Sequence, residues 1–357
     1  MIRPAALTSL IPLLGVRDHT RSLGSSPHVP RGPAPVAVVS GGSRGLGLCM
    51  ARELGGRGFR VVLGARQQGE LDEAVDALRA VGVETATVAC DLRRPGEAAR
   101  LVEAAVDRYG RLDMVVANAG VIEVGPFEAM ADEEFHDAMD TIFWGAYGLV
   151  RSALPHLRRS PAGRVLVISS IGGRISVPHL LPYSCAKFAV QALGEGLRAE
   201  LAGSGVTVTT AVPGLMRTGS HVQVRLAGQA RKEYGWFAAL SGMPLLSMDA
   251  GRAAARIVRA AMRGRPEIVL TPAAKLGVRA HGIAPATTTL ALGLVNRVLP
   301  APEGGPRATV PAGPVDRAQH SRLLGVLKSL NDRAARSANQ FSPQGRPWGN
   351  NRPRRTA

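Results

Sequence analysis

A glycine-rich turn near the start of the chain restricts its possible folds more than any other feature. Residues 36–39 form a compact apolar run typical of a buried strand, and a helical pattern continues to about Arg57. Between them lies the turn Ser40-Gly41-Gly42-Ser43-Arg44-Gly45-Leu46-Gly47. Glycines let a backbone approach a phosphate closely, and a helix N-terminus supplies unpaired N–H groups and partial positive charge. The position between strand and helix therefore predicts a phosphate cradle, with a plain flexible turn as the alternative.

Strand and helix patterns alternate along the following two hundred or so residues. Apolar runs typical of strands cover 60–63, 85–89, 113–117, 165–168, 206–212 and 267–270. Helical patterns cover 70–81, 97–109, 132–157, 183–202 and 250–262. This order predicts a single α/β domain, a doubly wound Rossmann-type parallel sheet with helices on both faces. In such sheets ligands bind at the carboxyl ends of the strands.

The ends of the second and third predicted strands bear on the choice of dinucleotide. An acid after the second strand usually bonds the ribose 2′-hydroxyl, whereas an arginine there accommodates a 2′-phosphate. Here Arg66 takes that place and Arg44 stands in the glycine turn. We therefore predict NADP(H) in preference to NAD(H), although either arginine could be a solvated surface residue. Asp91, followed by Leu92, can reach an adenine or serve as an ordinary turn residue.

The segment at residues 164–187 carries the side chains best suited to proton transfer. Proline is tolerated in the first turn of a helix, so Pro182 predicts a helix start that puts Tyr183 and Lys187 on one face. The ammonium favours the phenolate, so we expect the pKa of Tyr183 to fall from about 10 toward the range of a general acid/base. Ser170 could hold a substrate oxygen against the phenol. An ordinary amphipathic Tyr–Lys pair is the alternative.

In this order and spacing, the motifs resemble the short-chain dehydrogenase/reductase family over about residues 35–272. The turn 40–47 resembles the family's Thr-Gly-x-x-x-Gly-x-Gly turn, and Tyr183-x-x-x-Lys187 resembles its catalytic pair, with Ser170 in the position of its serine. Asp91 matches its adenine-contacting acid. Two further matches are Asn118-Ala119-Gly120, after the fourth strand, and Pro213-Gly214 with Thr218, the nicotinamide-binding turn.

The resemblance implies an NADP(H)-dependent enzyme that transfers hydride between nicotinamide and a carbonyl/alcohol pair. Tyr183 would protonate the carbonyl oxygen, Lys187 would depress the pKa of Tyr183 and bond the nicotinamide ribose, and Ser170 would orient the substrate. The implied dinucleotide-binding residues are Ser40, Gly41, Ser43, Arg44, Gly45, Leu46, Gly47, Arg66, Asp91, Leu92, Asn118, Ala119, Gly120, Tyr183, Lys187, Pro213, Gly214 and Thr218. Family members are commonly dimers or tetramers, so a homo-oligomer is expected.

One residue departs from the family's pattern. Where the family usually has an asparagine that holds a proton-relay water, this chain has Ile142. An isoleucine side chain cannot hold that water, so Thr141, Asp140 or a backbone carbonyl would have to anchor another relay. The other outcomes are slow turnover, or a non-catalytic NADP(H)-binding sensor or scaffold.

The residues around the predicted site favour an apolar substrate, lipid-like or polyketide-like. Ile175, Val177, Leu180 and Leu181 flank Tyr183, and residues 219–248, which lack a clear period, are expected to form a loop that acts as a substrate lid. Trp144 is expected either to line the pocket or to be a buried structural residue. His179 is expected to be a surface residue, with a substrate contact as the alternative.

The remaining segments are predicted to be extensions of this domain. Residues 1–34 resemble a linker, and 273–300 form an apolar helical extension that would cover the core, contact a second subunit or lie on a membrane. Residues 301–357 resemble a largely disordered Pro- and Arg-rich tail. An amphipathic helix with Leu323, Leu324, Leu327 and Leu330 would interrupt this tail.

The basic charge of the chain does not by itself indicate nucleic-acid binding. Of the net charge of +17, +3 lies in residues 1–35 and +7 in residues 301–357, and the rest is spread without a basic run. We expect no specific nucleic-acid partner and at most weak membrane-surface contact. No apolar segment reaches the ~18 residues of a spanning helix. The three cysteines lack metal-ligand spacing and suggest a reducing compartment, so a cytoplasmic location and no metal site are predicted.

Overall fold

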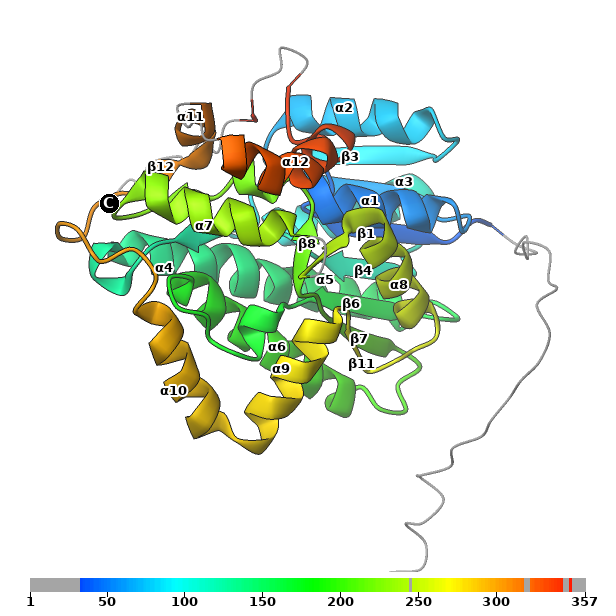
Figure 1. Ribbon diagram of the computed structural model, residues 1–357. Helices are drawn as coiled ribbons and strands as arrows, with labels where there is room; N and C mark the ends of the chain where they lie inside the picture. The colour runs from blue at the N-terminus through cyan, green and yellow to red at the C-terminus, as the bar shows by residue number, and fades with distance from the viewer. Residues whose placement is uncertain (1–32, 244–245, 318–321, 343–346, 349–357) are drawn as a thin grey trace, which may run out of the picture. The chain divides into compact units, whose positions relative to one another are not determined.

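The computed structural model describes residues 33–243, 246–317, 322–342 and 347–348. Its central sheet has seven strands in the order β11-β7-β6-β4-β1-β2-β3, all parallel (Figure 1). The strands are β1 (Val36–Ser40), β2 (Arg60–Ala65), β3 (Thr85–Ala89), β4 (Met114–Ala117), β6 (Arg164–Ile168), β7 (Thr207–Val212) and β11 (Glu267–Val269). The chain runs outward from β1 to β3 and then returns to β4 beside β1, so the strand order reverses between β1 and β4, the usual position of a ligand cleft.

Helices cover both faces of this sheet. One layer consists of α1 (Gly45–Gly55), α2 (Gln68–Arg79) and α8 (Ala250–Met262). The opposite layer consists of α3 (Glu97–Tyr109), α4 (Asp132–Ala138), α5 (Gly145–Leu157) and α6 (Leu181–Glu200). The prediction of a doubly wound Rossmann-type sheet is confirmed.

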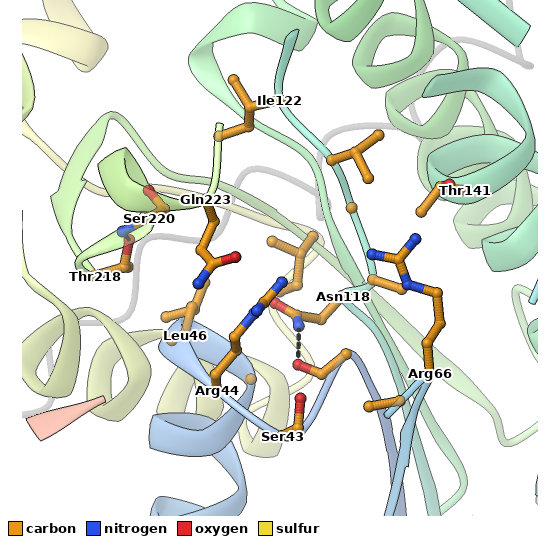
Figure 2. Close-up of a pocket in the computed structure, with 18 of the residues that line it drawn as sticks. Ser43, Arg44, Leu46, Arg66, Asn118, Ile122, Thr141, Thr218, Ser220 and Gln223 are labelled. Atoms are coloured by element: carbon orange, nitrogen blue, oxygen red, sulfur yellow. Dashed lines mark hydrogen bonds between the residues drawn. The ribbon is translucent and has the colours of Figure 1, made fainter. Parts of the chain in front are cut away.

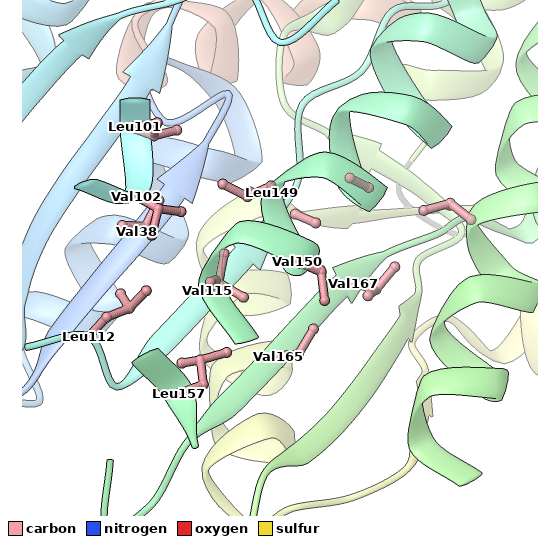
Figure 3. Close-up of a cluster of buried hydrophobic side chains, with 14 of the residues drawn as sticks. Val38, Leu101, Val102, Leu112, Val115, Leu149, Val150, Leu157, Val165 and Val167 are labelled. Atoms are coloured by element: carbon pink, nitrogen blue, oxygen red, sulfur yellow. The ribbon is translucent and has the colours of Figure 1, made fainter. Parts of the chain in front are cut away.

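The strands are apolar on both sides because both faces are covered. Val38, Val115 and Val165 pack against the α3/α5/α6 layer, as Figure 3 shows, whereas Val39 and Val116 face the α1/α8 layer. Successive residues of a strand point to opposite faces, so near-continuous valine runs suit such a sheet. Burying each valine side chain contributes about 1.5–3 kcal/mol, which makes this sheet a rigid support for the loops at its carboxyl edge.

The helix predicted over 132–157 is interrupted. After α4, residues Met139–Trp144 form a π-helical turn (η4), and α5 follows directly. A π turn inserts extra backbone and rotates the residues that follow it, and such turns often occur at functional sites. Ile142 is buried in the core, while its neighbour Thr141 lines the cleft described below.

The segment expected to be a loop-like lid contains regular structure. A short turn η6 (Ser220–Val222), strand β9 (Arg225–Leu226) and helix α7 (Ala230–Gly242) lie within 219–248. Strand β9 sits between β5 (Glu123–Val124) and β12 (Val310–Pro311), and β8 (Leu215–Arg217) pairs with β10 (Ser247–Asp249). Two further short turns are η3 (Phe127–Ala129) and η5 (Ile171–Gly173). The segment is therefore tied into small sheets beside the cleft.

The apolar extension after the sheet does not cover the core. It forms α9 (Pro272–Ile283) and α10 (Pro285–Asn296), as predicted, but no residue of α10 is buried. Ile283 is 86% exposed and Leu290 74% exposed. Of the three alternatives for this segment, the one that it covers the core was therefore wrong, because its apolar side chains face outward. In the described part of the chain, no helix combines the length and the apolarity that crossing a bilayer requires.

The expectation of a largely disordered tail also fails for the residues that the structure describes. Besides β12, the tail forms α11 (Ala312–Arg317) and α12 (Arg322–Ser337). Helix α12 packs against α7. It includes the four leucines that predicted an amphipathic helix, although the side chains of Leu323, Leu324, Leu327 and Leu330 lie outside the described part.

Candidate functional site

A cleft opens at the carboxyl ends of the strands and brings together most of the residues singled out from the sequence. Residues of the glycine turn, of the ends of β2 and β4 and of α6 line it, together with the loop after β7 (Figure 2). The predicted site residues that line it are Gly41, Ser43, Arg44, Gly45, Leu46, Gly47, Arg66, Asp91, Leu92, Asn118, Ala119, Gly120, Tyr183, Lys187, Pro213 and Thr218.

The glycine turn has the shape that a phosphate cradle requires. A Cβ atom on Gly47 would lie 2.1 Å from the carbonyl oxygen of Gly41, so a side chain there would displace the turn. The residue before α1, Arg44, makes no side-chain cap. The first-turn N–H groups of Leu46 and Gly47 therefore remain for an anion, and they add to the positive end of the helix dipole. These residues fit a dinucleotide pyrophosphate.

Glu70, which the sequence analysis did not select, organises the same turn. It lies in the first turn of α2 and is 4% exposed. Its carboxylate accepts hydrogen bonds from Ser43 Oγ at 2.7 Å and from Arg44 at 3.0 Å. The sequence offered only one indication of this role, an acidic residue in the first turn of the helix after β2. Acidic residues are common at that helix position, so this indication does not identify a site.

Two guanidinium groups extend into the cleft from the glycine turn and from the end of β2, as Figure 2 shows for Arg44 and Arg66. Burial lowers the pKa of Arg44; Glu70 opposes this shift, and the positive charge of Arg66 adds to it. Burial and the nearby Arg93 likewise lower the pKa of Arg66. Guanidinium groups whose positive charge is disfavoured by burial and by a neighbouring arginine form an environment suited to an anion.

The side chain of Asp91 is engaged within the protein. It accepts hydrogen bonds from Arg93, the shortest at 2.6 Å, and Arg93 also pairs with Asp137. Burial opposes ionisation of Asp91, but the bonds from Arg93 outweigh it and lower the pKa of the carboxyl. Arg93 was not anticipated from the sequence, because its partner Asp137 lies 44 residues later, in α4.

Two residues predicted to bind the dinucleotide, Ser40 and Gly214, do not line the cleft. Ser40 is 1% exposed, and its hydroxyl accepts the N–H of Asn118 at 3.0 Å and of Ala119 at 3.1 Å. Its role is to join the ends of β1 and β4. Gly214 lies against α9, where an added Cβ would approach Thr271 Oγ1 to 2.4 Å. The Asn118 side chain donates to the carbonyl of Gly41 at 3.1 Å and so holds the turn in place.

Tyr183, Lys187 and Ser170 meet at the other end of the cleft. Helix α6 begins at Leu181 with Pro182 in its first turn, as predicted. The Lys187 ammonium lies 5.6 Å from the centre of the Tyr183 ring and donates to the carbonyl of Ile168 at 2.7 Å. The hydroxyl of Ser170 accepts the N–H of Gly172 at 3.1 Å and hydrogen-bonds with Tyr183. Ser170 itself is buried just behind the cleft surface.

The predicted fall in the pKa of Tyr183 is not found. Burial raises the pKa of Tyr183 to about 12, although its bond with Ser170 opposes this shift. Burial also lowers the pKa of Lys187 to about 7. Removing both groups from water disfavours the phenolate and the ammonium, and here this effect exceeds their mutual attraction. Tyr183 is therefore a protonated phenol at neutral pH.

Ile142 lies close to Lys187 in the structure. A Cβ placed on Gly120 would lie 3.6 Å from Cγ1 of Ile142 and 3.9 Å from Nζ of Lys187, so both side chains flank the same glycine. The neighbouring Thr141 lines the cleft, and its buried hydroxyl has no hydrogen-bond partner among the described residues. A buried, unsatisfied hydroxyl in a cleft is costly unless a ligand or water completes it.

The apolar wall of the cleft comes from residues other than those predicted. It consists of Val121, Ile122, Ile168, Met216 and Val224. The four apolar residues expected to flank the site do not line it: Ile175, Val177, Leu180 and Leu181. Leu180 and Val177 pack in a separate core with α7.

Two further expectations about single residues were wrong. Trp144 is 53% exposed and lies beside Phe143 and Tyr147, so it is neither buried nor part of the cleft. His179 is buried, not at the surface, and its Nδ1 lies 2.9 Å from the carboxylate of Glu233 on α7. This pair anchors the predicted lid next to the start of α6.

Comparison with known proteins agrees with this architecture. The sequence model of the short chain dehydrogenase family matches residues 35–227. The chain belongs to this family. A protein named as a ketoacyl reductase in Streptomyces coelicolor is 37% identical over 192 residues, which are 53% of this chain and 74% of that protein. An 11-beta-hydroxysteroid dehydrogenase of Sesamum indicum is 32% identical over 64% of this chain and 66% of that protein.

A solved structure extends the likeness. An actinorhodin polyketide ketoreductase variant crystallised with NADPH is 29% identical, with a TM-score of 0.59, over 67% of this chain and 96% of that one. The present chain, as a member of the short-chain dehydrogenase family, is an oxidoreductase that acts on carbonyl and alcohol groups. The comparisons lend no support to a non-catalytic sensor or scaffold.

Proposed function

We propose that this short-chain dehydrogenase uses NADP(H) to reduce a ketone on an apolar, polyketide-like or lipid-like substrate. The observation that carries the proposal is a protonated Tyr183, bonded to Ser170 and one helical turn from Lys187, in the same cleft as the glycine turn. With its pKa raised to about 12, the phenol is protonated at neutral pH, so it has a proton to donate once hydride transfer makes the carbonyl oxygen basic.

The chain's own residues perform the proton chemistry. A bound nicotinamide would supply the hydride. As charge develops on the substrate carbonyl oxygen, Tyr183 Oη donates its proton to that oxygen, and the Ser170 hydroxyl donates a hydrogen bond to it. The charged form of Lys187 then stabilises the phenolate that remains. The N–H groups of Leu46 and Gly47 would hold the pyrophosphate of the bound dinucleotide.

Thr141 takes the place of the family's asparagine in returning a proton to the site. Its hydroxyl lines the cleft, is buried, and has no partner in the described part of the chain. Ile142, beside Lys187, is buried in the core instead. A water held by the Thr141 hydroxyl would satisfy that group and connect the lysine side of the cleft with solvent.

The choice of NADP(H) rests on the paired guanidinium groups of Arg44 and Arg66. In a buried setting the positive charge of Arg66 disfavours that of Arg44, and a 2′-phosphate between them would relieve that repulsion. Arg66 follows β2, the position at which an arginine accommodates a 2′-phosphate, so it carries more of the discrimination.

The proposal is tested with the full chain, NADPH or NADH, and a panel of apolar cyclic and linear ketones and aldehydes. We expect carbonyl-dependent oxidation of NADPH, faster for apolar ketones than for small polar ones. Turnover with NADH alone would overturn the cofactor assignment. No carbonyl-dependent oxidation of either dinucleotide would overturn the proposed function.

A further inference from the structure

The C-terminal end of the described chain reaches the phosphate end of the cleft. The N–H of Gly45, in the glycine turn, donates to the carbonyl of Ala338 at 2.8 Å. The side-chain amide of Asn339 donates to the carbonyls of Ser43 at 2.9 Å and Glu70 at 3.1 Å. The residues that follow α12 are therefore bonded to both elements that shape the phosphate cradle, and α12 itself lies alongside α7 (Figure 1).

The same segment is bonded to the opposite wall of the cleft. Asn331, 0% exposed, accepts the N–H of Gly219 at 2.9 Å. Gly219 has a φ of +72°, and a Cβ there would lie 2.2 Å from Cα of Ala335. A glycine is thus required for α12 to dock at this position. Residues 331–340, which we name the strap, therefore link the loop after β7 to the glycine turn.

Gln340 is the strap residue that lines the cleft itself. It is 2% exposed, and its Nε2 donates to the carbonyl of Thr218 at 2.9 Å. Its Oε1 is buried without a hydrogen-bond partner among the described residues. A primary amide carries two N–H donors and one acceptor oxygen. One donor and the acceptor thus remain, between Gly45 and Thr218.

We infer that Gln340 is a dinucleotide-binding residue and that the strap forms a third wall of the cofactor site. The ligand chemistry that satisfies Gln340 is a phosphate oxygen, which accepts its second N–H, next to a ribose hydroxyl, which donates to Oε1. A dinucleotide presents these two groups side by side. The inference rests on the proposed use of a nicotinamide dinucleotide at this cleft.

The strap also predicts how the ligand leaves. It places Gln340 against the cleft from both walls, so a dinucleotide that leaves must first break its contacts with Gln340. Contacts of this kind act mainly on the dissociation rate. Removing Gln340 should therefore shorten the lifetime of the complex more than it slows association.

The test measures binding to the full chain by NADPH fluorescence, in equilibrium titration and in stopped-flow displacement. Gln340→Ala should raise the Kd of NADPH about threefold to tenfold, the range of one or two net hydrogen bonds. Gln340→Glu keeps the size but puts a carboxylate near the pyrophosphate, and it should raise the Kd further. The matched control is Ser337→Ala, an exposed serine of the same strap at the end of α12, which should leave the Kd unchanged.

A probe without the pyrophosphate bridge separates a local contact from a general loss of structure. Gln340 is bonded to Thr218, in the turn assigned to the nicotinamide, so its contact is expected with the nicotinamide half of the dinucleotide. The affinity for 2′,5′-ADP, which keeps the adenosine 5′-phosphate but lacks that half, should change less than twofold in both Gln340 variants. Equal losses for NADPH and 2′,5′-ADP, or an unchanged Kd and dissociation rate for NADPH, would overturn the inference. If NADPH bound tightly through Gln340 but no ketone was turned over, the proposed function would be rejected. The assignment of the strap to the dinucleotide site would then still hold.

Discussion

The two ends of the cleft are built in different ways. At the Tyr183 end, the hydrogen bonds connect residues close in sequence: Lys187 bonds the carbonyl of Ile168, nineteen residues earlier. At the phosphate end, Asn339 bonds the carbonyl of Ser43, 296 residues earlier. The Tyr183 end is thus formed by β6 and the following helix α6. The phosphate end is complete only when α12 and the residues after it have docked.

This difference has consequences for substitutions. The Tyr183 end holds its groups against the core of the sheet, where Lys187 is 4% exposed, so changes there should affect the chemical step. The phosphate end consists of polar side chains and backbone groups from three distant segments. Changes there should affect binding and release of the dinucleotide and leave the rate at saturation nearly unchanged.

The largest effect is expected for Tyr183→Phe. Without the phenol no proton reaches the carbonyl oxygen, and kcat should fall about 10³-fold, within the range of general acid catalysis. The Kd of NADPH should stay within twofold, because the phosphate end is untouched. Steady-state assays and fluorescence titration measure the two quantities. A Tyr183→Phe variant as active as the parent would contradict the role of the Tyr183 end in the chemical step.

Next in size is the effect of pH through Lys187. Burial lowers the pKa of this amine to about 7, below its usual value, so the ammonium is lost as pH rises through neutrality. The kcat/KM for NADPH, which reports the free enzyme, should then fall up to tenfold per pH unit above about 7. Lys187→Arg keeps a charge at every pH and should remove this decline. A profile that is flat to pH 9 in the parent would contradict the assignment.

A smaller effect is expected at Thr141. Thr141→Val keeps the shape of the side chain but removes the hydroxyl, and kcat should fall about tenfold with little change in the KM for NADPH. The slower step should be partly restored by small exogenous amines or imidazole, which carry protons in place of the relay. Thr141→Ser, which retains the hydroxyl, is the matched control. Equal rates for the Val and Ser variants would exclude a role in proton return.

The smallest effect is expected at the phosphate end. Arg66→Ser should raise the KM for NADPH about fivefold and leave that for NADH unchanged, because one charge-assisted contact to the 2′-phosphate is lost. The kcat should not change. Arg44→Ser should have the weaker effect of the two, since Arg66 holds the position after β2 at which an arginine accommodates a 2′-phosphate. A fall in kcat with NADPH for either variant would contradict the conclusion that the phosphate end affects dinucleotide binding and not the chemical step.

Much of the fold and of the Tyr183 end could be predicted from local patterns. The valine runs on both faces of the strands and the helices between them indicated the parallel sheet, and the spacing of Tyr183 and Lys187 placed both on α6. Ser170 was selected as a hydroxyl near the end of the predicted strand before Tyr183, and the family resemblance added the Asn118 segment. Each of these is a property of neighbouring residues or of a short motif.

Other features depend on contacts that no local pattern encodes. Glu70 and Arg93 act through partners in other elements, Ser43 and Asp137 respectively. Trp144 is exposed and His179 buried because of what packs beside them, which their own spacing does not indicate. Composition was also misleading for two segments. Helix α10 is apolar, yet none of its residues is buried, whereas the more polar tail buries Asn331 and Gln340.

The order of residues alone determined the doubly wound sheet, the glycine turn and the pairing of a phenol with an amine one helical turn away. Periodicity and short-range geometry suffice for such features. Only the tertiary structure decided that burial raises the pKa of Tyr183 and lowers that of Lys187, and that Gln340 completes the cleft. Burial and long-range hydrogen bonds depend on which distant segments pack together, and that is settled only when the whole chain has folded.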